Sequence, residues 1–96
     1  MPEKGGYVYI LANITHSVLY TGVTNDIARR LYEHQQGSID SFSKRYKTTK
    51  LVYIEFFNDI RDAITAEKTI KAGSRSNKES LIVEANPEWA DLSKDF

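Results

Sequence analysis

Residues 7–34 read YVYILANITHSVLYTGVTNDIARRLYEH, and this stretch decides the fold. Over residues 7–12 the side chains alternate between two sets, Tyr-Tyr-Leu and Val-Ile-Ala. That period of two is typical of a strand whose faces are used differently. A polar turn follows at residues 13–17, and residues 18–20 begin a second β-prone run that Gly22 is expected to break. The stretch therefore predicts two antiparallel strands joined by a short turn.

A helix is predicted to begin near Ile27, because residues 24–26 (Thr-Asn-Asp) are all good N-cap types. One broad side of this helix carries Ile27, Arg30, Leu31 and His34, at positions i, i+3, i+4 and i+7. A cation and an imidazole therefore lie among core residues, beside two strands that carry three tyrosines.

A third strand is predicted at residues 51–57 (LVYIEFF). Because this run is apolar nearly throughout, we expect it to be the central strand, covered on both faces. A helix is predicted over residues 59–73, since Asp59 can cap its start and Gly73 can end it.

The last helix is predicted to start at residues 74–76, with Ser76 and Glu79 as a candidate capping box. Asn86, followed by a proline, stops it, and Trp89 is expected to fold back as a hydrophobic clasp. The order β-β-α-β-α-α predicts an α/β fold in which helices pack over a small sheet. A chain of 96 residues has room for one domain.

Glu67 lies inside the apolar sector of the helix predicted at residues 59–73, three residues from both Ile64 and Ile70. A carboxylate there costs several kcal/mol unless a cation or a hydrogen-bond donor meets it. The sequence leaves two alternatives open: an ion pair with Lys71 at i+4, or a metal ligand at the bottom of a cleft.

A polar, basic segment occupies residues 38–50, and it is long for a connection in a compact domain. We expect its cations Lys44, Arg45 and Lys47 to contact nucleic acid, with Tyr46 stacking on an unpaired base. The alternative is a solvated spacer. The chain has 13 basic and 13 acidic residues, so a basic face can only be local.

Cysteine is absent, which excludes disulfides and thiolate metal sites and is typical of a reducing compartment. The first residues, MPEKGG, lack the apolar core of a signal peptide, and no apolar run approaches the roughly 18 residues of a membrane span. We therefore expect a soluble, cytoplasmic protein without membrane association.

Residues 7–9 (Tyr-Val-Tyr) and 20–22 (Tyr-Thr-Gly) resemble the two signature tripeptides of the GIY-YIG nuclease domain. Arg30 falls eight residues after Gly22 and His34 twelve after it, where that family places a catalytic arginine and a common histidine.

Glu67 in AEKTIK and the NPEW segment at residues 86–89 extend the likeness over nearly the whole chain, which is closest to the small single-domain bacterial branch. We expect one such domain over residues 5–93. Two motif positions differ, since Tyr7 replaces a glycine and Thr21 an aliphatic residue. The motif tyrosines and glycine are retained.

The resemblance implies a three-stranded antiparallel sheet flanked by helices, and an endonuclease that hydrolyses one DNA strand per site. It also implies a single Mg²⁺ or Mn²⁺ held by Glu67, with Tyr9 and Tyr20 at the site. One glutamate is enough protein ligand, because Mg²⁺ accepts few carboxylates and keeps several waters.

Arg30 suits the scissile phosphate, because its fork donates two parallel hydrogen bonds. Tyr9 is assigned as the base that activates water and Tyr20 as its orienting partner. A free phenol has a pKa of about 10 and is a poor base near pH 7. His34, one turn beyond Arg30, is therefore assigned as the proton relay. The alternative makes both tyrosines ordinary sheet residues and pairs Arg30 with Asp26.

The function predicted is a metal-dependent DNA endonuclease with a role in DNA repair. The alternative is a non-catalytic nucleic-acid- or protein-binding module on the same fold. Damaged, branched, flapped and single-stranded nucleic acids all remain open as substrates, as does a protein partner that recruits the domain. Gly22 is assigned a structural role. Asn86 either approaches the site, as a late asparagine of the family does, or caps the last helix.

Overall fold

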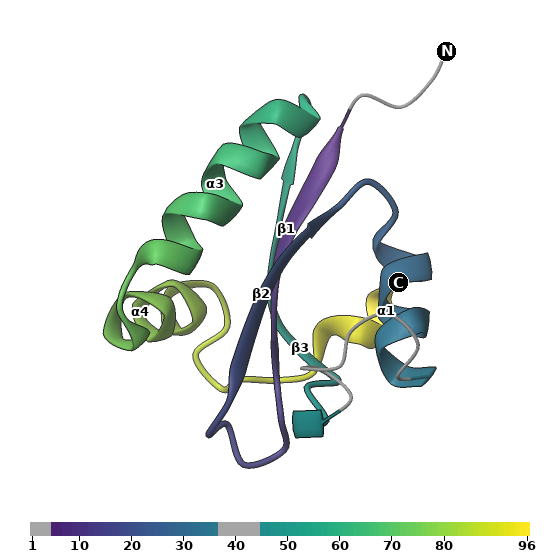
Figure 1. The fold of residues 1–96 in the computed structure, drawn as a ribbon. Coiled ribbons are helices and arrows are strands. Elements are labelled where there is room, and N and C mark those ends of the chain that lie inside the picture. The colour runs from purple at the N-terminus through teal and green to yellow at the C-terminus, as the bar shows by residue number, and fades with distance from the viewer. Residues whose placement is uncertain (1–4, 37–44) are drawn as a thin grey trace.

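The computed structural model describes residues 5–36 and 45–96. Its elements are β1 (Gly6–Ala12), β2 (Leu19–Thr24), α1 (Ile27–Gln36), β3 (Lys50–Phe57), α3 (Ile60–Ala72), α4 (Arg75–Ala85) and the 3₁₀ turn η1 (Leu92–Asp95) (Figure 1). This order confirms the predicted β-β-α-β-α-α arrangement. Within the described ranges, no helix has both the length and the apolar character needed to cross a membrane.

The sheet has the order β2-β1-β3, and both neighbouring pairs are antiparallel. The three-stranded antiparallel sheet is therefore confirmed, but β1 is its central strand. The prediction that residues 51–57 form the centre was wrong. Only Leu51, Val52 and Tyr53 of β3 are buried, whereas Phe56 near its end is half exposed. Strand β3 lies at an edge of the sheet. A run of apolar residues alone cannot distinguish an edge strand from a central one.

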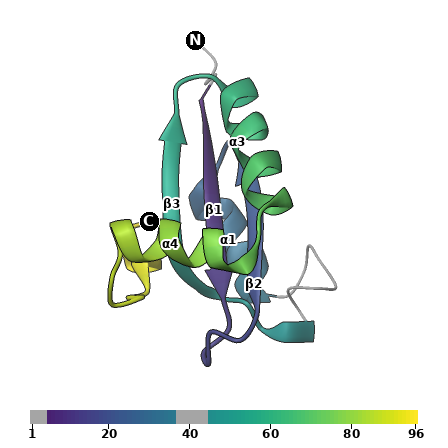
Figure 2. The ribbon, with the colours of Figure 1, turned by 90° about the vertical axis from the view of Figure 1, so that its left-hand side faces the viewer.

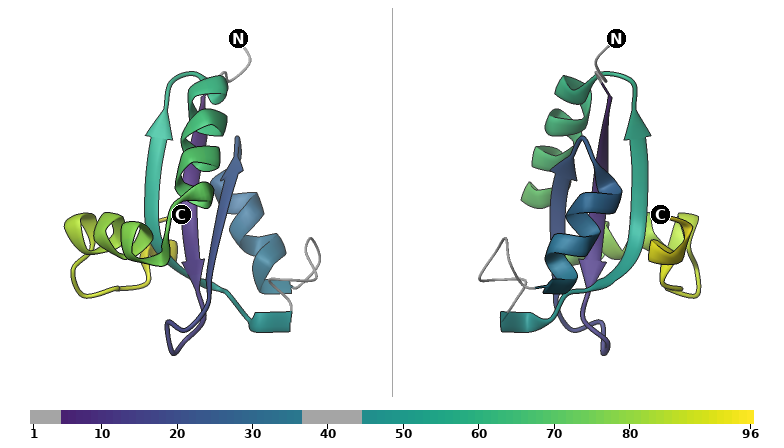
Figure 3. Two further views of the ribbon diagram at one scale, coloured as in Figure 1. Left: turned by 60° about the vertical axis from the view of Figure 1, so that its left-hand side comes forward. Right: turned by 90° about the vertical axis from the view of Figure 1, so that its right-hand side faces the viewer.

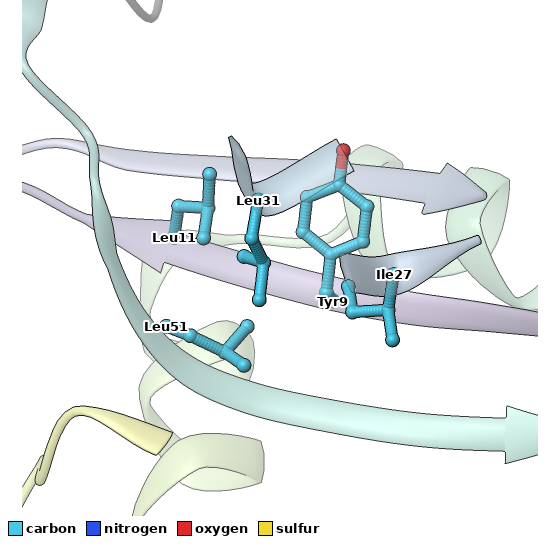
Figure 4. Packing of buried hydrophobic residues seen from close by; sticks show 5 residues of the cluster. All are labelled: Tyr9, Leu11, Ile27, Leu31 and Leu51. Atoms are coloured by element: carbon cyan, nitrogen blue, oxygen red, sulfur yellow. The ribbon is translucent and has the colours of Figure 1, made fainter. Parts of the chain in front are cut away.

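The alternation in β1 separates two hydrophobic layers. On one face, Tyr9 and Leu11 pack with α1, in a cluster made of Tyr9, Leu11, Ile27, Leu31 and Leu51 (Figure 4). On the other face, Ile10 and Ala12 pack beneath α3 and α4, in a cluster made of Ile10, Ala12, Val52, Tyr53 and Ile82. Figures 2 and 3 show α3 and α4 on one side of the sheet and α1 on the other.

The C-terminal segment closes the outer edge of β3. Asn86 Nδ2 donates to the carbonyl of Val52 at 3.1 Å, and the amide of Leu51 donates to Asp91 Oδ1 at 3.2 Å. Trp89 packs against the α4-side cluster, as the predicted clasp requires. Side chains thus satisfy backbone groups that an edge strand would otherwise present to other chains.

Helices α3 and α4 are capped by polar side chains. Asp59 caps α3, and Gly73 follows its last residue, as predicted. The predicted capping box at Ser76 was wrong, because Ser74 is the N-cap of α4 and accepts from the amide of Asn77 at 3.1 Å. Glu79 instead pairs with Arg75 on the helix surface.

Gly22 lies within β2, which continues to Thr24 instead of ending at the glycine as expected. It pairs with Tyr9 across the sheet. A Cβ at position 22 would lie 2.4 Å from the Tyr9 hydroxyl oxygen and 2.5 Å from Cζ. Glycine is therefore needed here because the ring of Tyr9 lies over its backbone.

The first prediction concerns this contact. Gly22→Ala should lower the free energy of unfolding by about 1–3 kcal/mol, because the new methyl group must displace the Tyr9 ring. In a Tyr9→Leu background the same substitution should cost much less. Urea unfolding of the four proteins measures the coupling. Equal costs in both backgrounds would contradict this explanation.

Candidate functional site

Three side chains from three elements meet on the α1 face of the sheet, and we call them the tyrosine–histidine cluster: Tyr9, Tyr20 and His34. The ring centroids of Tyr9 and Tyr20 are 6.4 Å apart. The His34 ring lies 5.9 Å from that of Tyr9 and 5.0 Å from that of Tyr20, edge-on to both. The structure therefore brings together three of the residues singled out from the sequence.

A buried hydrogen bond joins the cluster. The Tyr9 hydroxyl lies 3.1 Å from His34 Nε2. Tyr9 is fully buried and His34 is 2% exposed. Tyr20 is half buried and lies on the edge strand β2. The cluster therefore has a closed end, where oxygen and imidazole meet, and a more accessible side at Tyr20.

Local sequence rules explain how the rings converge. In the register of β1 and β2, Tyr9 is opposite Gly22, and Leu11 is opposite Tyr20. Residues directly opposite in a pair share one face of the sheet, so both tyrosines face α1. His34 lies seven residues after the buried Ile27, on the side of α1 that packs against this face.

Arg30 lies one helical turn before His34 on α1, so the two side chains are neighbours. Its side chain is 29% exposed, and Nε lies 3.5 Å from Glu33 Oε1. That nitrogen is buried and makes no hydrogen bond within the described residues. Arg29 turns outward, with 58% of its side chain exposed. The sequence therefore separated the inner arginine from the outer one correctly.

Glu33 is the part of this surface that sequence reasoning missed. It lies beside both arginines, with Oε2 3.9 Å from Arg29 Nε. The predicted alternative paired Arg30 with Asp26, whose carboxylate instead accepts from the amide of Arg29 at the start of α1. The i, i+3 and i, i+4 spacings to Arg30 and Arg29 were the available signal.

Glu67 lies on the largely buried side of α3, as its place in the apolar sector predicted. Its side chain is 12% exposed, and Oε2 lies 3.2 Å from Nζ of Lys71, which is itself 61% exposed. Helix α3 packs on β1 and β2 from the face opposite α1, as Figure 3 shows. Helix α3, which carries Glu67, and the tyrosine–histidine cluster therefore lie on opposite faces of the sheet.

At Glu67, a metal ion could be held by few protein ligands. Within residues 5–36 and 45–96, there is no group of three or more His, Cys, Asp or Glu side chains that could hold a metal ion. One inward carboxylate still fits a cation such as Mg²⁺, whose remaining ligands are water and substrate oxygens. Lys71 would have to release the carboxylate of Glu67 for that purpose.

The residues expected to bind nucleic acid are described in part. Tyr46 is exposed, and the guanidinium carbon of Arg45 lies 5.5 Å from its ring centroid, a cation–π distance. Lys47 is exposed next to them. Lys44 lies outside the described residues.

The amide of Asn86 is engaged by the chain's own backbone. Nδ2 donates to the carbonyls of Val52 and Ala90, and Oδ1 accepts from the amide of Ala90. Asn86 is also the C-cap of α4. These contacts favour the capping interpretation over a role in the site.

Known proteins resemble this chain along nearly its full length. A family model of the GIY-YIG catalytic domain matches residues 5–80. A UPF0213 protein of Bacillus licheniformis is 37% identical over 98 residues, covering 100% of both chains. One of Clostridium perfringens is 41% identical over 76 residues, covering 79% of this chain and 81% of that protein.

A solved structure shows the same fold. The solution NMR structure of a UPF0213 protein from Bacillus halodurans matches with a TM-score of 0.59 and 30% sequence identity. The match covers 94% of this chain and 95% of that one. The paired tripeptides, the fold and these relatives agree, and the chain therefore belongs to the GIY-YIG domain family, among its small bacterial UPF0213 members.

Proposed function

We propose that this protein, as one domain over residues 5–93, is a metal-dependent endonuclease that hydrolyses phosphodiester bonds in branched or damaged DNA. Membership of a nuclease family supports a nucleic-acid substrate. The observation that carries the proposal is the hydrogen-bonded pair of Tyr9 and His34, with Arg30 one turn away. This arrangement combines a proton path with a cation suited to phosphate.

In this proposal substrate binding must first give a water access to the buried Tyr9 hydroxyl. Tyr9 then accepts a proton from that water while its own proton passes to His34 Nε2, 3.1 Å away. The imidazole then starts with its proton on Nδ1 and can accept at Nε2. Handing the proton on avoids a free phenolate, which is scarce near pH 7. Tyr20, the more accessible tyrosine, orients the water.

Arg30 is assigned to the scissile phosphate. Its buried Nε makes no hydrogen bond within the described residues, and such groups are rare in folded proteins. A non-bridging phosphate oxygen is an acceptor of the right charge, and the guanidinium can bind it with two parallel hydrogen bonds. The developing negative charge would be stabilised by a donor that is already in place.

Glu67 is the residue proposed to hold a single Mg²⁺ or Mn²⁺. When bound, such a cation neutralises charge on the phosphate and stabilises the leaving oxygen. We assign substrate binding to Arg45, Tyr46 and Lys47, together with Lys44, which lies outside the described residues.

A second function is favoured by one contact. The carboxylate of Glu67, the proposed metal ligand, is paired with the ammonium group of Lys71. If that pair is permanent, the fold serves as a module that binds nucleic acid or a recruiting protein without turnover. Incubation with branched and linear DNA, with and without Mg²⁺ or Mn²⁺, separates the two functions.

The second prediction concerns the two arginines. Arg30→Ala should lower the cleavage rate on the order of 10²–10³-fold, because a preorganised charge is removed from the transition state. Arg29→Ala is the matched control, since its side chain neighbours the same Glu33 but points outward. It should have little effect. Equal losses at both positions would mean that general attraction to phosphate is being measured.

The third prediction concerns Glu67. In thermal melts, Mn²⁺ should raise the melting temperature of the wild type. At a concentration a hundredfold above the dissociation constant, Mn²⁺ should stabilise the folded protein by about 2.7 kcal/mol. Glu67→Gln should keep or raise the basal melting temperature, abolish the Mn²⁺ shift and abolish cleavage.

Lys71→Met is the control, because it breaks the ion pair and leaves the carboxylate. It should lower the melting temperature in the absence of metal, since the carboxylate of Glu67 is only 12% exposed and loses the cation that meets it, and it should keep the Mn²⁺ shift. A large drop in the melting temperature of Glu67→Gln, with no Mn²⁺ shift in the wild type, would exclude the metal role.

A further inference from the structure

A cleft of about 400 Å³ lies at the start of β2, and we call it the β2-edge cleft. It is lined by Ser17, Val18, Leu19, Tyr46, Arg75 and Lys78. These residues come from the β1–β2 turn, the first residue of β2, the segment before β3 and the first turn of α4. Its size is within the range of pockets that hold a small-molecule-sized group, such as one nucleotide.

The cleft adjoins the tyrosine–histidine cluster along the chain. Leu19 lines the cleft, and the next residue, Tyr20, belongs to the cluster. Leu19 packs toward the α4-side core and Tyr20 toward the α1-side core. Because β2 is an edge strand, a chain molecule bound at Tyr20 can continue around this edge into the cleft.

The cleft has two charged side chains, Arg75 and Lys78. Both are cationic, but they contact different groups of the protein. Arg75 holds the β1–β2 turn against α4. Its Nη1 donates to the carbonyl of Ser17 at 2.9 Å, Nη2 donates to that of His16, and Nε pairs with Glu79 at 2.8 Å. Arg75 is therefore a structural clamp whose charge is already paired.

Lys78 supplies the charge that is available to a ligand. Its Nζ donates to the carbonyl of Gly73 at 2.8 Å, which is a neutral acceptor. Across the described part of the chain, no carboxylate forms an ion pair with Lys78. An anion entering the cleft would therefore meet an ammonium group that no carboxylate neutralises.

Tyr46 adds an aromatic surface to the same cleft. Tyr46 is 39% exposed as a residue, and its ring has the Arg45 guanidinium beside it. Rings flanked by cations are typical of sites for single-stranded nucleic acid, in which the ring stacks on a base and the cations follow the phosphates. Stacking of this kind requires a base that is not already stacked in a duplex.

We propose that the β2-edge cleft binds an unpaired strand of nucleic acid next to the position of cleavage, with Tyr46 stacking on a base and Lys78 contacting a phosphate. The inference rests on the proposed nuclease function for the placement of the strand at Tyr20. It narrows the substrate to DNA that carries a single-stranded segment beside the scissile bond. An acidic peptide pairing with the edge of β2 is the rival occupant.

The fourth prediction concerns the binding of single-stranded DNA to the β2-edge cleft, measured under conditions in which no cleavage occurs. Fluorescence anisotropy in EDTA, over a series of salt concentrations, compares a labelled single-stranded oligonucleotide with a duplex of the same sequence. The wild type should bind the single strand more tightly. Tyr46→Ala should weaken that binding roughly 5- to 100-fold and leave the salt slope unchanged.

Lys78→Met should weaken binding and reduce the slope of log affinity against log salt by about 0.7, as one lost phosphate contact predicts for a single strand. Lys78→Arg keeps the charge and should restore both values. Lys68→Met removes an exposed cation of α3 outside the cleft and should behave as the wild type. Thermal melts verify that each variant is folded.

The cleft proposal is overturned if Tyr46→Ala and Lys78→Met bind as the wild type does, or if Lys68→Met loses as much affinity as Lys78→Met. It is also overturned if the wild type ignores the oligonucleotide but binds a labelled polyglutamate peptide through Lys78. Arg30→Ala should lose cleavage, and its remaining single-strand binding should still depend on Tyr46 and Lys78. If the wild type binds the single strand through Tyr46 and Lys78 but cuts no DNA, the nuclease proposal is wrong and the cleft proposal stands. If the wild type cuts DNA and both cleft variants bind as the wild type does, the cleft proposal is wrong and the nuclease proposal stands.

Discussion

The hydrogen bond between the Tyr9 hydroxyl and His34 Nε2 is the interaction on which the α1 face of this domain depends. It joins the central strand to the last turn of α1, and both partners are buried. Leaving either polar group unpaired there would cost about 1–3 kcal/mol. The ring of Tyr9 reaches this position only because Gly22 opposite carries no side chain. A motif glycine, a motif tyrosine and the histidine therefore form one packing unit.

The two edges of the sheet are treated differently. At β3, the side chains of Asn86 and Asp91 take up backbone groups of Val52 and Leu51. Burial opposes ionisation of Asp91, but hydrogen bonds from Ser93 and Leu51 outweigh it and lower the pKa of this carboxyl. At β2, the edge instead borders the tyrosine–histidine cluster and the β2-edge cleft. One edge is closed by the C-terminal segment, and the other borders the surfaces to which we assign chemistry.

Electrostatics in this domain are local. Its formal net charge is zero, so long-range attraction cannot supply most of the affinity for a polyanion. The cations that matter are held individually: Arg30 half buried beside Glu33, and Lys78 against a neutral carbonyl. Such a protein is suited to recognising the shape of its substrate, with a few positioned contacts. That property agrees with the preference that we propose, for DNA that departs from a regular duplex.

The sequence alone determined the features that depend on local spacing. The alternation in β1 follows from a period of two residues, and the shared helix side of Arg30 and His34 follows from one of 3.6. The caps at Asp59 and Gly73 follow from the residue types at the two ends of the helix. The tertiary structure decided which strand is central, because burial of β1 comes from neighbours distant in sequence. It also extended β2 past Gly22 to Thr24, and it brought Lys78 and Tyr46 to the lining of one cleft. No local period encodes such contacts, since they exist only once the sheet has its helices on both faces.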